Sequence, residues 1–296
     1  MKTVKGLHEK MGTFENANTS FHQAARCKRY TNEVLAFSMV KEEELLRATE
    51  EIQNLTYRQG EYKIFKVFEP KERLIMALPF YDRVVQHMIC NAIQPVFENG
   101  FYYHSYACRS GKGMHAASDT LYQWMYETEV KQGLRMYAFK GDISKYFASI
   151  PHDKLKDENR RYIGDKKALM LMDDIIDHNG ILPDGVGIPV GNLTSQLFAN
   201  VYGNKLDKFC KHVLHIPYFV RYMDDFIILS DDLEQLKEWV KRIEEFLENE
   251  MLLHINPKST ILYAGNGIDF CGYIHYADHK KVRKSSIRKL KQDVKA

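Results

Sequence analysis

Tyr222-Met223-Asp224-Asp225 is the stretch that decides the fold, because it sets two adjacent carboxylates between two short runs with strand character. The runs are 218–221 (YFVR) and 226–229 (FIIL), and their aromatic and β-branched residues predict a hairpin with the acids at its turn. Two acids at a tight turn repel each other unless a cation neutralises them, and oxygen-only ligands suit Mg²⁺. Taken alone, the stretch fits a polar turn equally well, since Asp is a favoured turn residue.

A third carboxylate changes that balance. Asp142 lies in another strand-like stretch, 139–147 (FKGDISKYF), which predicts a strand with this acid at the end where the chain turns away. A strand-end acid and a hairpin pair can meet on adjacent strands of one sheet. Three carboxylates there could hold two Mg²⁺ ions about 3.5–4 Å apart, the arrangement that drives in-line nucleotidyl transfer. One ion would lower the pKa of an attacking 3′-hydroxyl and the other would stabilise the leaving pyrophosphate.

The order of the motifs along the chain resembles that of reverse transcriptases. Asp142 matches the family's first catalytic Asp, and Phe147 matches the aromatic residue that screens the sugar 2′-hydroxyl. The other matches are the fingers segment at 73–86 (RLIMALPFYDRVVQ), the GxxxS loop at 191–196 (GNLTSQ), the YxDD box at 222–225, the lysine motif at 256–260 (NPKST) and the primer-grip hairpin at 270–273 (FCGY). Each motif is weak alone, but their joint order from about residue 63 to 273 is specific.

The resemblance implies an α+β protein of the right-hand polymerase fold, with an antiparallel palm sheet backed by helices. It implies RNA-directed DNA polymerase activity through two Mg²⁺ ions, for which Mn²⁺ could substitute. Asp142 and Asp224 would bind the ions, Asp225 would assist, and the Ile143 carbonyl would add an oxygen ligand. Lys258, in the lysine motif, would protonate the leaving pyrophosphate, although a plain surface lysine fits that position nearly as well.

The same resemblance assigns residues to the substrates. Lys71 and Arg73 fall where the family binds the incoming triphosphate, and Arg forks onto phosphate oxygens while Lys supplies a point charge. The alternative for them is a surface pair beside nearby glutamates. Phe147 would act as a steric gate, unless it is a core aromatic residue. The nucleotide site would also include Val190, Gly191 and Gln196, and nucleic acid would contact Arg109, Lys112, Gly272, Tyr273, Lys284 and Arg288.

The residue before the glycine of the GxxxS motif and the residue after its serine narrow the choice of subfamily. Most reverse transcriptases carry Gln before the loop glycine and Pro after its Ser, whereas this chain has Val190 and Gln196. That combination resembles the enzymes of diversity-generating retroelements, which copy a template RNA error-prone, chiefly at adenines. Val offers only shape where Gln offers a hydrogen bond, a contact worth about 0.5–1.5 kcal/mol. Infidelity is therefore implied by the resemblance and not by one residue.

Composition sets the outer limits. With 296 residues and 45% hydrophobic content, the chain can bury a sizeable core. It has no run of about 18 apolar residues and no signal-peptide pattern, which predicts a cytoplasmic protein, bacterial or phage-encoded by resemblance. Five scattered cysteines without a CxxC pair predict reduced thiols and neither a zinc site nor disulfides.

Charge is mild overall but uneven. The formal net charge is +3, yet residues 280–295 hold eight Lys or Arg and one acid, Asp293. This segment predicts a thumb-side surface that binds phosphates without reading sequence and is strongly salt-dependent. A solvated helix or a frayed tail is the alternative. Because Ala296 follows the primer-grip-like hairpin so soon, we expect a very short or truncated thumb.

Hydrophobic periodicity places the elements around these motifs. We expect a strand near 62–68 and helices at about 40–52, 80–97, 152–178, 192–214 and 233–247, with Asn192 as an N-cap. The expected organisation is an N-terminal helical extension at 1–60, fingers at 61–138, a palm at 139–273 with an insertion at 153–187, and the start of a thumb at 274–296.

Other functional classes stay open. The chain could be a group II intron-like or defence-associated reverse transcriptase, which the type of RNA beside its gene would discriminate. It could also be a non-catalytic RNA-binding scaffold with a polymerase fold, although intact catalytic acids argue against that. The expected partners are template RNA, primer or cDNA, deoxynucleoside triphosphates and, by resemblance only, a small basic accessory protein; no membrane is expected.

Overall fold

The computed structural model describes residues 3–68 and 72–294, which fall into two compact units. Unit 1 comprises the residues up to Phe101 together with Phe147–Tyr202. Unit 2 comprises Tyr102–Tyr146 and the residues from Gly203 onward. The predicted division into extension, fingers, palm and thumb stays a prediction.

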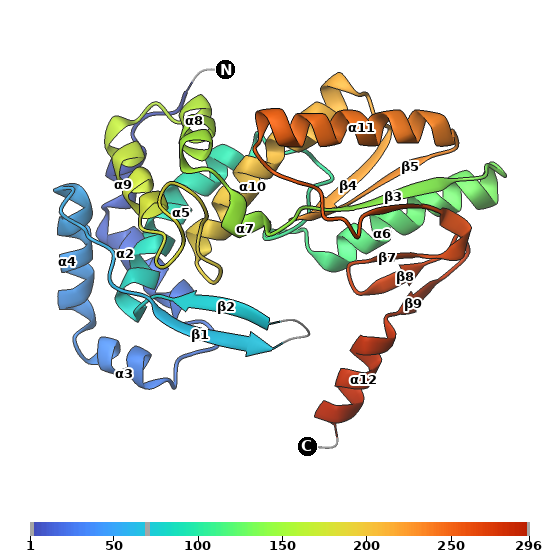
Figure 1. Cartoon of the computed structure of the whole chain (residues 1–296). Helices are drawn as coiled ribbons and strands as arrows, with labels where there is room; N and C mark the ends of the chain where they lie inside the picture. The colour runs from blue at the N-terminus through green and yellow to red at the C-terminus, as the bar shows by residue number, and fades with distance from the viewer. Residues whose placement is uncertain (1–2, 69–71, 295–296) are drawn as a thin grey trace. The chain divides into compact units, whose positions relative to one another are not determined.

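Helices make up most of unit 1 (Figure 1). They are α1 (Leu7–Met11), α2 (Phe14–Ala24), α3 (Asn32–Met39), α4 (Lys41–Gln53), α5 (Phe80–Glu98), α7 (Tyr146–Ser149, which straddles the boundary), α8 (His152–Tyr162), α9 (Lys166–Asp177) and the first part of α10 (Leu193–Lys208). An antiparallel hairpin of β1 (Lys63–Phe68) and β2 (Glu72–Ala77) completes the unit. The strand predicted near 62–68 and the helix predicted at about 80–97 are confirmed as β1 and α5.

The helical segment predicted over 152–178 is in fact two helices, α8 and α9. Gly164, a poor helix residue, lies in the break, and the Asp165 side chain caps α9 by accepting the N–H groups of Lys167 and Ala168. The same carboxylate accepts the N–H groups of Leu7 and His8 in α1, at 2.8 and 3.0 Å. One side chain therefore caps two helices, a tertiary role that a local pattern cannot reveal.

The helix predicted over 192–214 begins as expected and ends differently. The Asn192 carbonyl accepts the Gln196 N–H at 3.3 Å, as an N-cap carbonyl does. After α10 the chain continues as a π-helical segment, Phe209–Val213, and a similar segment, Tyr126–Lys131, follows α6 (Met114–Met125).

An antiparallel sheet organises unit 2. Its strands lie in the order β4 (Tyr218–Tyr222), β5 (Asp225–Ser230), β3 (Tyr137–Asp142) and β6 (Thr260–Tyr263). One face packs on α6 through Ala138, Val220, Ile227 and Leu229, and α11 (Leu233–Glu250) covers the other face (Figure 1). The predicted α+β architecture, with helices backing an antiparallel sheet, is confirmed.

A further antiparallel sheet carries the end of unit 2. It contains β7 (Ile268–Phe270), β8 (Tyr273–His275) and β9 (Lys280–Val282), and a 3₁₀ turn, Ala264–Asn266, leads into it. The helix α12 (Lys284–Asp293) follows β9 (Figure 1). No helix within residues 3–68 and 72–294 is long and apolar enough to cross a membrane.

Candidate active site

The sheet register of unit 2 sets the first predicted acid against the second pair. Asp142, the last residue of β3, lies opposite Asp225, the first residue of β5. On the other side of β5, Asp225 pairs with Tyr222 at the end of β4. The backbone positions of Asp142, Asp224 and Asp225 therefore lie at one end of the same sheet, although a long segment of sequence separates Asp142 from the other two.

A close approach explains the glycine before Asp142. A Cβ on Gly141 would lie 2.3 Å from the Phe226 ring, because Phe226 crosses directly over it from β5. Phe226 in turn packs against the rings of Phe139 and Phe219 in the core. A side chain at position 141 would displace this ring and, with it, the strand pairing that aligns the acids.

The turn between β4 and β5 is tight and strained. Met223 has a φ of 60°, and among the described residues of the turn it alone has a positive φ, which is the pattern of a type II′ turn. Glycine usually fills that position, so a methionine there stores backbone strain. The Asp224 carbonyl accepts the N–H of Ile143 at 3.2 Å, which ties the turn to the end of β3.

The electrostatics of these acids favour a cation. Burial, followed by the neighbouring Asp224 and Asp142 carboxylates, raises the pKa of Asp225 to about 6, while Lys140 and Arg283 oppose the shift. The negative charges are thus close enough to repel one another, and the donor set is oxygen only, which fits Mg²⁺ or Mn²⁺.

The metal ligands themselves stay a prediction. Among residues 3–68 and 72–294, no group of three or more His, Cys, Asp or Glu side chains is arranged to hold a metal ion. Mg²⁺ commonly takes only one or two protein carboxylates and completes its shell with water and substrate phosphates. The residues that would hold it here are Asp142, Asp224, Asp225 and the carbonyl of Ile143.

Asn256 is a functional candidate that the sequence analysis missed. Its Nδ2 donates to Asp142 Oδ2 at 2.6 Å, and its backbone N–H donates to the Asp142 carbonyl at 2.7 Å. The Ser259 hydroxyl accepts the Asp142 N–H at 3.0 Å. These contacts orient the carboxylate from outside any cation shell. Asn256 belongs to the NPKST motif, but in the sequence only the lysine of that motif has a recognisable chemical role.

We expect Asn256→Ala to slow primer extension about 10–100-fold and to raise the Mg²⁺ requirement, because it removes the donor that orients Asp142. Asn256→Asp should be worse still, since it adds a negative charge beside the acids. Mg²⁺ titrations of the extension rate measure both effects. Asn266→Ala, at an exposed asparagine in the 3₁₀ turn, is the matched control. Wild-type activity in the Asp variant would rule this role out.

Lys258 is exposed, and its backbone N–H donates to Asn256 Oδ1 at 3.1 Å. The lysine thus follows directly on the residue that orients Asp142. Its proposed transfer of a proton stays a prediction.

The predicted nucleotide-binding residues belong to unit 1. The Val190 carbonyl accepts the Met76 N–H at 3.1 Å, which joins the GxxxS loop to β2, and Gly191 adopts a φ of 120°. The Phe147 carbonyl accepts the Ile188 N–H at 2.8 Å, and the side chain is half-buried. Unit 1 therefore gathers the β1–β2 hairpin, the Val190 loop, the start of α10 with Gln196 and the backbone of Phe147. Lys71 lies outside the described residues, and Arg73 is described by its backbone, which pairs with Val67.

Two predicted nucleic-acid contacts are engaged within their own loop of unit 2. Arg109 Nη1 donates to the carbonyls of Tyr102 and Ser105, at 2.7 and 2.6 Å. Lys112 Nζ donates to the Tyr103 carbonyl at 3.0 Å and lies 3.4 Å from the centre of that ring. Both cations shape this loop, whatever they also bind.

The remaining predicted contacts lie at the end of unit 2. Phe270 pairs with Tyr273 around Cys271 and Gly272, which confirms the predicted hairpin. The Tyr273 hydroxyl lies 3.1 Å from His115 Nδ1. Lys284 and Arg288 are exposed and share one face of α12, since they are four residues apart.

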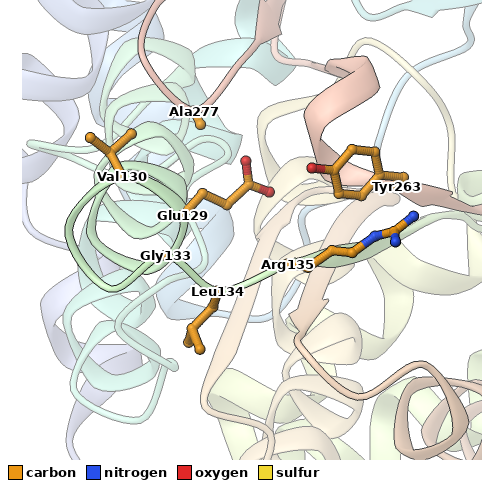
Figure 2. Close-up of a pocket in the computed structure, with 7 residues that line it drawn as sticks. All are labelled: Glu129, Val130, Gly133, Leu134, Arg135, Tyr263 and Ala277. Carbon is orange, nitrogen blue, oxygen red and sulfur yellow. The ribbon is translucent and has the colours of Figure 1, made fainter.

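A separate hollow of about 460 Å³ is shown in Figure 2. Its lining residues Leu134 and Arg135 come just before β3, at the other end of that strand from Asp142. The hollow is lined by Glu129, Val130, Gly133, Leu134, Arg135, Tyr263 and Ala277. The Arg135 guanidinium lies over the Tyr263 ring, 4.9 Å from its centre, and Glu129 projects into the hollow (Figure 2). None of the predicted site residues lines it.

The family model of reverse transcriptase (RNA-dependent DNA polymerase) matches residues 66–275, well over half of the sequence. The chain belongs to this family. The match covers the motifs from the fingers segment to the primer-grip hairpin, so it includes the three acids that lie at one end of the sheet in unit 2.

Three relatives share between 22% and 29% of their aligned residues with this chain. Protein YkfC of Escherichia coli is 25% identical over 251 residues, which is 69% of this chain and 62% of YkfC. The putative COX1/OXI3 intron 2 protein of Saccharomyces cerevisiae is 22% identical over 65% of this chain and 29% of that protein. An uncharacterized 91 kDa protein in the cob intron of Schizosaccharomyces pombe is 29% identical over 45% of this chain and 16% of that protein. The chain thus spans less than two thirds of each of these relatives.

Solved structures support the fold. Apo telomerase from Candida tropicalis, truncated from its C-terminal domain, has a TM-score of 0.55 at 14% identity, covering 77% of this chain and 55% of that one. Telomerase from Candida albicans with a TWJ fragment of telomeric RNA has a TM-score of 0.56 at 11% identity, covering 78% and 48%. At these identities the likeness shows the fold alone, and the predicted polymerase fold is confirmed.

Proposed function

We propose that this chain is an RNA-directed DNA polymerase that makes cDNA from a template RNA by two-metal nucleotidyl transfer. The observation that carries the proposal is the register of β3 on β5, which sets Asp142 against Asp225 beside the Asp224 turn. Family membership supports the same activity. Repulsion between neighbouring carboxylates destabilises the protein, and a bound cation removes that repulsion. The cluster is therefore best explained as a cation-binding site.

Each residue near this cluster has a role in the proposal. Asp142 and Asp224 hold two Mg²⁺ or Mn²⁺ ions, and Asp225 and the Ile143 carbonyl add oxygen donors. When bound, such ions lower the pKa of a primer 3′-hydroxyl and neutralise charge on the triphosphate. Asn256 holds the Asp142 carboxylate in one orientation, and Lys258 supplies a proton to the leaving pyrophosphate.

The test is primer extension on a defined RNA template, with the cDNA then sequenced. We expect product that depends on all four deoxynucleoside triphosphates and on Mg²⁺ or Mn²⁺. Failure to extend any primer under conditions where a known reverse transcriptase is active would overturn the polymerase assignment. It would favour the RNA-binding scaffold, which gel-shift binding of the same RNA would then reveal.

We further infer that the enzyme is error-prone and belongs to a diversity-generating retroelement. The support is the pair Val190, directly before the glycine of the GxxxS motif, and Gln196, directly after its serine. If this inference holds, the partners of the enzyme include a template RNA and a small basic accessory protein. Extension assays with and without candidate accessory proteins test for the accessory protein.

Val190→Gln is expected to lower misincorporation opposite template adenine about 2–10-fold, because it restores one hydrogen bond worth about 0.5–1.5 kcal/mol. Sequencing of cDNA from wild type and variant on one template measures this. Misincorporation opposite the other template bases serves as the internal reference. An unchanged error spectrum would exclude Val190 as a cause of infidelity.

An intron-type reverse transcriptase is the second candidate. The observation that favours it is that two relatives are named for introns, in S. cerevisiae and S. pombe. Accurate copying of adenines by the wild-type enzyme would favour this candidate, and so would an intron RNA beside the gene.

Phe147→Val is expected to raise ribonucleotide incorporation about 10–200-fold, because the smaller side chain leaves room for the 2′-hydroxyl that phenylalanine excludes by contact. The ratio of kcat/KM for a deoxynucleotide and its ribonucleotide measures the change. Phe14→Ala, at an exposed phenylalanine of α2, should leave the ratio unchanged. Equal sugar selectivity in wild type and the Phe147 variant would return Phe147 to a core role.

A further inference from the structure

Arg221 is a fully buried cation next to the acidic turn, and its guanidinium makes contacts on three sides within unit 2. Its Nε and Nη2 donate to the two carboxylate oxygens of Asp207, at 2.6 and 2.7 Å. Nη2 also donates to the Ser105 hydroxyl at 3.0 Å, and Nη1 donates to the Met223 carbonyl at 2.9 Å. The Asp207 side chain is fully buried as well.

The contact with Met223 falls on the strained residue of the turn. Met223 adopts a φ of 60°, and its carbonyl belongs to the peptide unit that leads into Asp224. The next carbonyl, that of Asp224, accepts the Ile143 N–H at 3.2 Å. Arg221 and Ile143 therefore hold successive peptide units, and together they fix the direction in which the Asp224 side chain leaves the backbone.

The helix that carries Asp207 leaves space for this arrangement. A Cβ on Gly203, one turn earlier in α10, would lie 2.7 Å from Arg221 Nη1 and 2.9 Å from the Tyr146 hydroxyl. The backbone of β4 is held from its outer edge too, since the Arg221 N–H donates to the His104 carbonyl and the Arg221 carbonyl accepts the Tyr106 N–H. Both ends of Arg221 are thus fixed, and the free rotation of a long side chain is removed.

We infer that Arg221, clamped by Asp207, is a positioning residue that holds the Met223 turn in its strained form and so aims Asp224 at the cation site. The inference rests on the proposed function only for the identity of the site as catalytic. A buried ion pair could instead serve overall stability alone. The fork geometry argues for more, because Nε and Nη2 donate to Asp207 while Nη1 donates to the Met223 carbonyl, and a lysine has a single nitrogen in place of these three.

The experiment compares Arg221→Lys with Ser105→Ala, a matched control that removes one hydrogen bond from the same guanidinium but spares Met223. Mn²⁺ affinity is measured by electron paramagnetic resonance, the Mg²⁺ dependence of primer extension by rate, and folding by thermal unfolding in EDTA. We expect Arg221→Lys to weaken Mn²⁺ binding and raise the half-activating Mg²⁺ concentration at least tenfold, while Ser105→Ala stays within about twofold of wild type for both. Adding Met223→Gly, which accepts a positive φ without strain, should recover part of the lost affinity.

Two results would overturn the inference. One is an Arg221→Lys protein that unfolds at a lower temperature but keeps wild-type Mn²⁺ affinity. The other is equal loss of affinity in Ser105→Ala. If Arg221→Lys does not fold, Asp207→Asn keeps the shape of the pair and must weaken Mn²⁺ binding for the inference to survive. If wild type binds Mn²⁺ and Arg221→Lys does not, yet wild type extends no primer, the positioning role stands and the proposed polymerase function fails.

Discussion

Asp224→Asn is expected to reduce the rate of primer extension on RNA by about 10³-fold or more, because an amide cannot supply the charge that holds a divalent cation. A factor of this size corresponds to the loss of about 4 kcal/mol of charge stabilisation in the transition state. The change is nearly isosteric, so the hairpin should persist. The Asp224 carbonyl that accepts the Ile143 N–H belongs to the backbone, so this hydrogen bond survives the substitution. Single-turnover extension of a labelled primer measures the rate, and thermal unfolding reports the fold.

Asp142→Asn should cause a loss of similar size, and the double variant should be little worse than either single one, because residues that act as a unit are not additive. Asp231→Asn is the control. It alters an exposed aspartate that follows the far end of β5, so activity should be retained. Full activity in the Asp224 variant would remove the site assignment.

The hairpin and its acids were predictable because local chemistry and tertiary structure agree there. Aromatic and β-branched residues flank the turn on both sides, and the buried strands β4 and β5 form where those runs lie. The amphipathic stripe at 233–247 became α11 for the same reason, with Leu236, Ile243 and Leu247 buried.

Asn256 and Arg221, which we expect to position the acids of the site, were not predicted because their partners are remote in the sequence. Asn256 reaches Asp142 across 114 positions, and nothing near either residue marks the pairing. Arg221 reads locally as a strand residue, and its partner Asp207 reads as the polar face of a helix. A side chain that bonds to a distant backbone or carboxylate leaves no periodic trace, so its role emerges only when the sheet is assembled.

Asp225→Asn is expected to stabilise the metal-free protein at neutral pH while it slows primer extension. The pKa of Asp225 is raised from an ordinary 3.8 to about 6, so between these values the folded state binds more protons than the unfolded state. Stability from this group therefore falls as pH rises from about 4 to about 6, and above that the ionised carboxylate is a constant penalty. The shift sets an upper bound of about 3 kcal/mol, which partial exposure reduces to about 1–2 kcal/mol. An amide carries no such penalty.

The difference in Tm between Asp225→Asn and wild type, measured in EDTA, should accordingly be near zero at pH 4 and reach several degrees at pH 8, at about 2–4 °C for each kcal/mol. Saturating Mg²⁺ should narrow the gap at pH 8, because a bound cation removes the repulsion in wild type and has one ligand fewer in the variant. Asp231→Asn should show neither effect. A variant that is less stable than wild type at pH 8 in EDTA, or a gap that ignores pH, would mean that Asp225 already has a compensating partner in the metal-free fold. A gap that opens with pH and closes with Mg²⁺ would instead place Asp225 in a cluster whose charge is kept for a cation at the expense of stability.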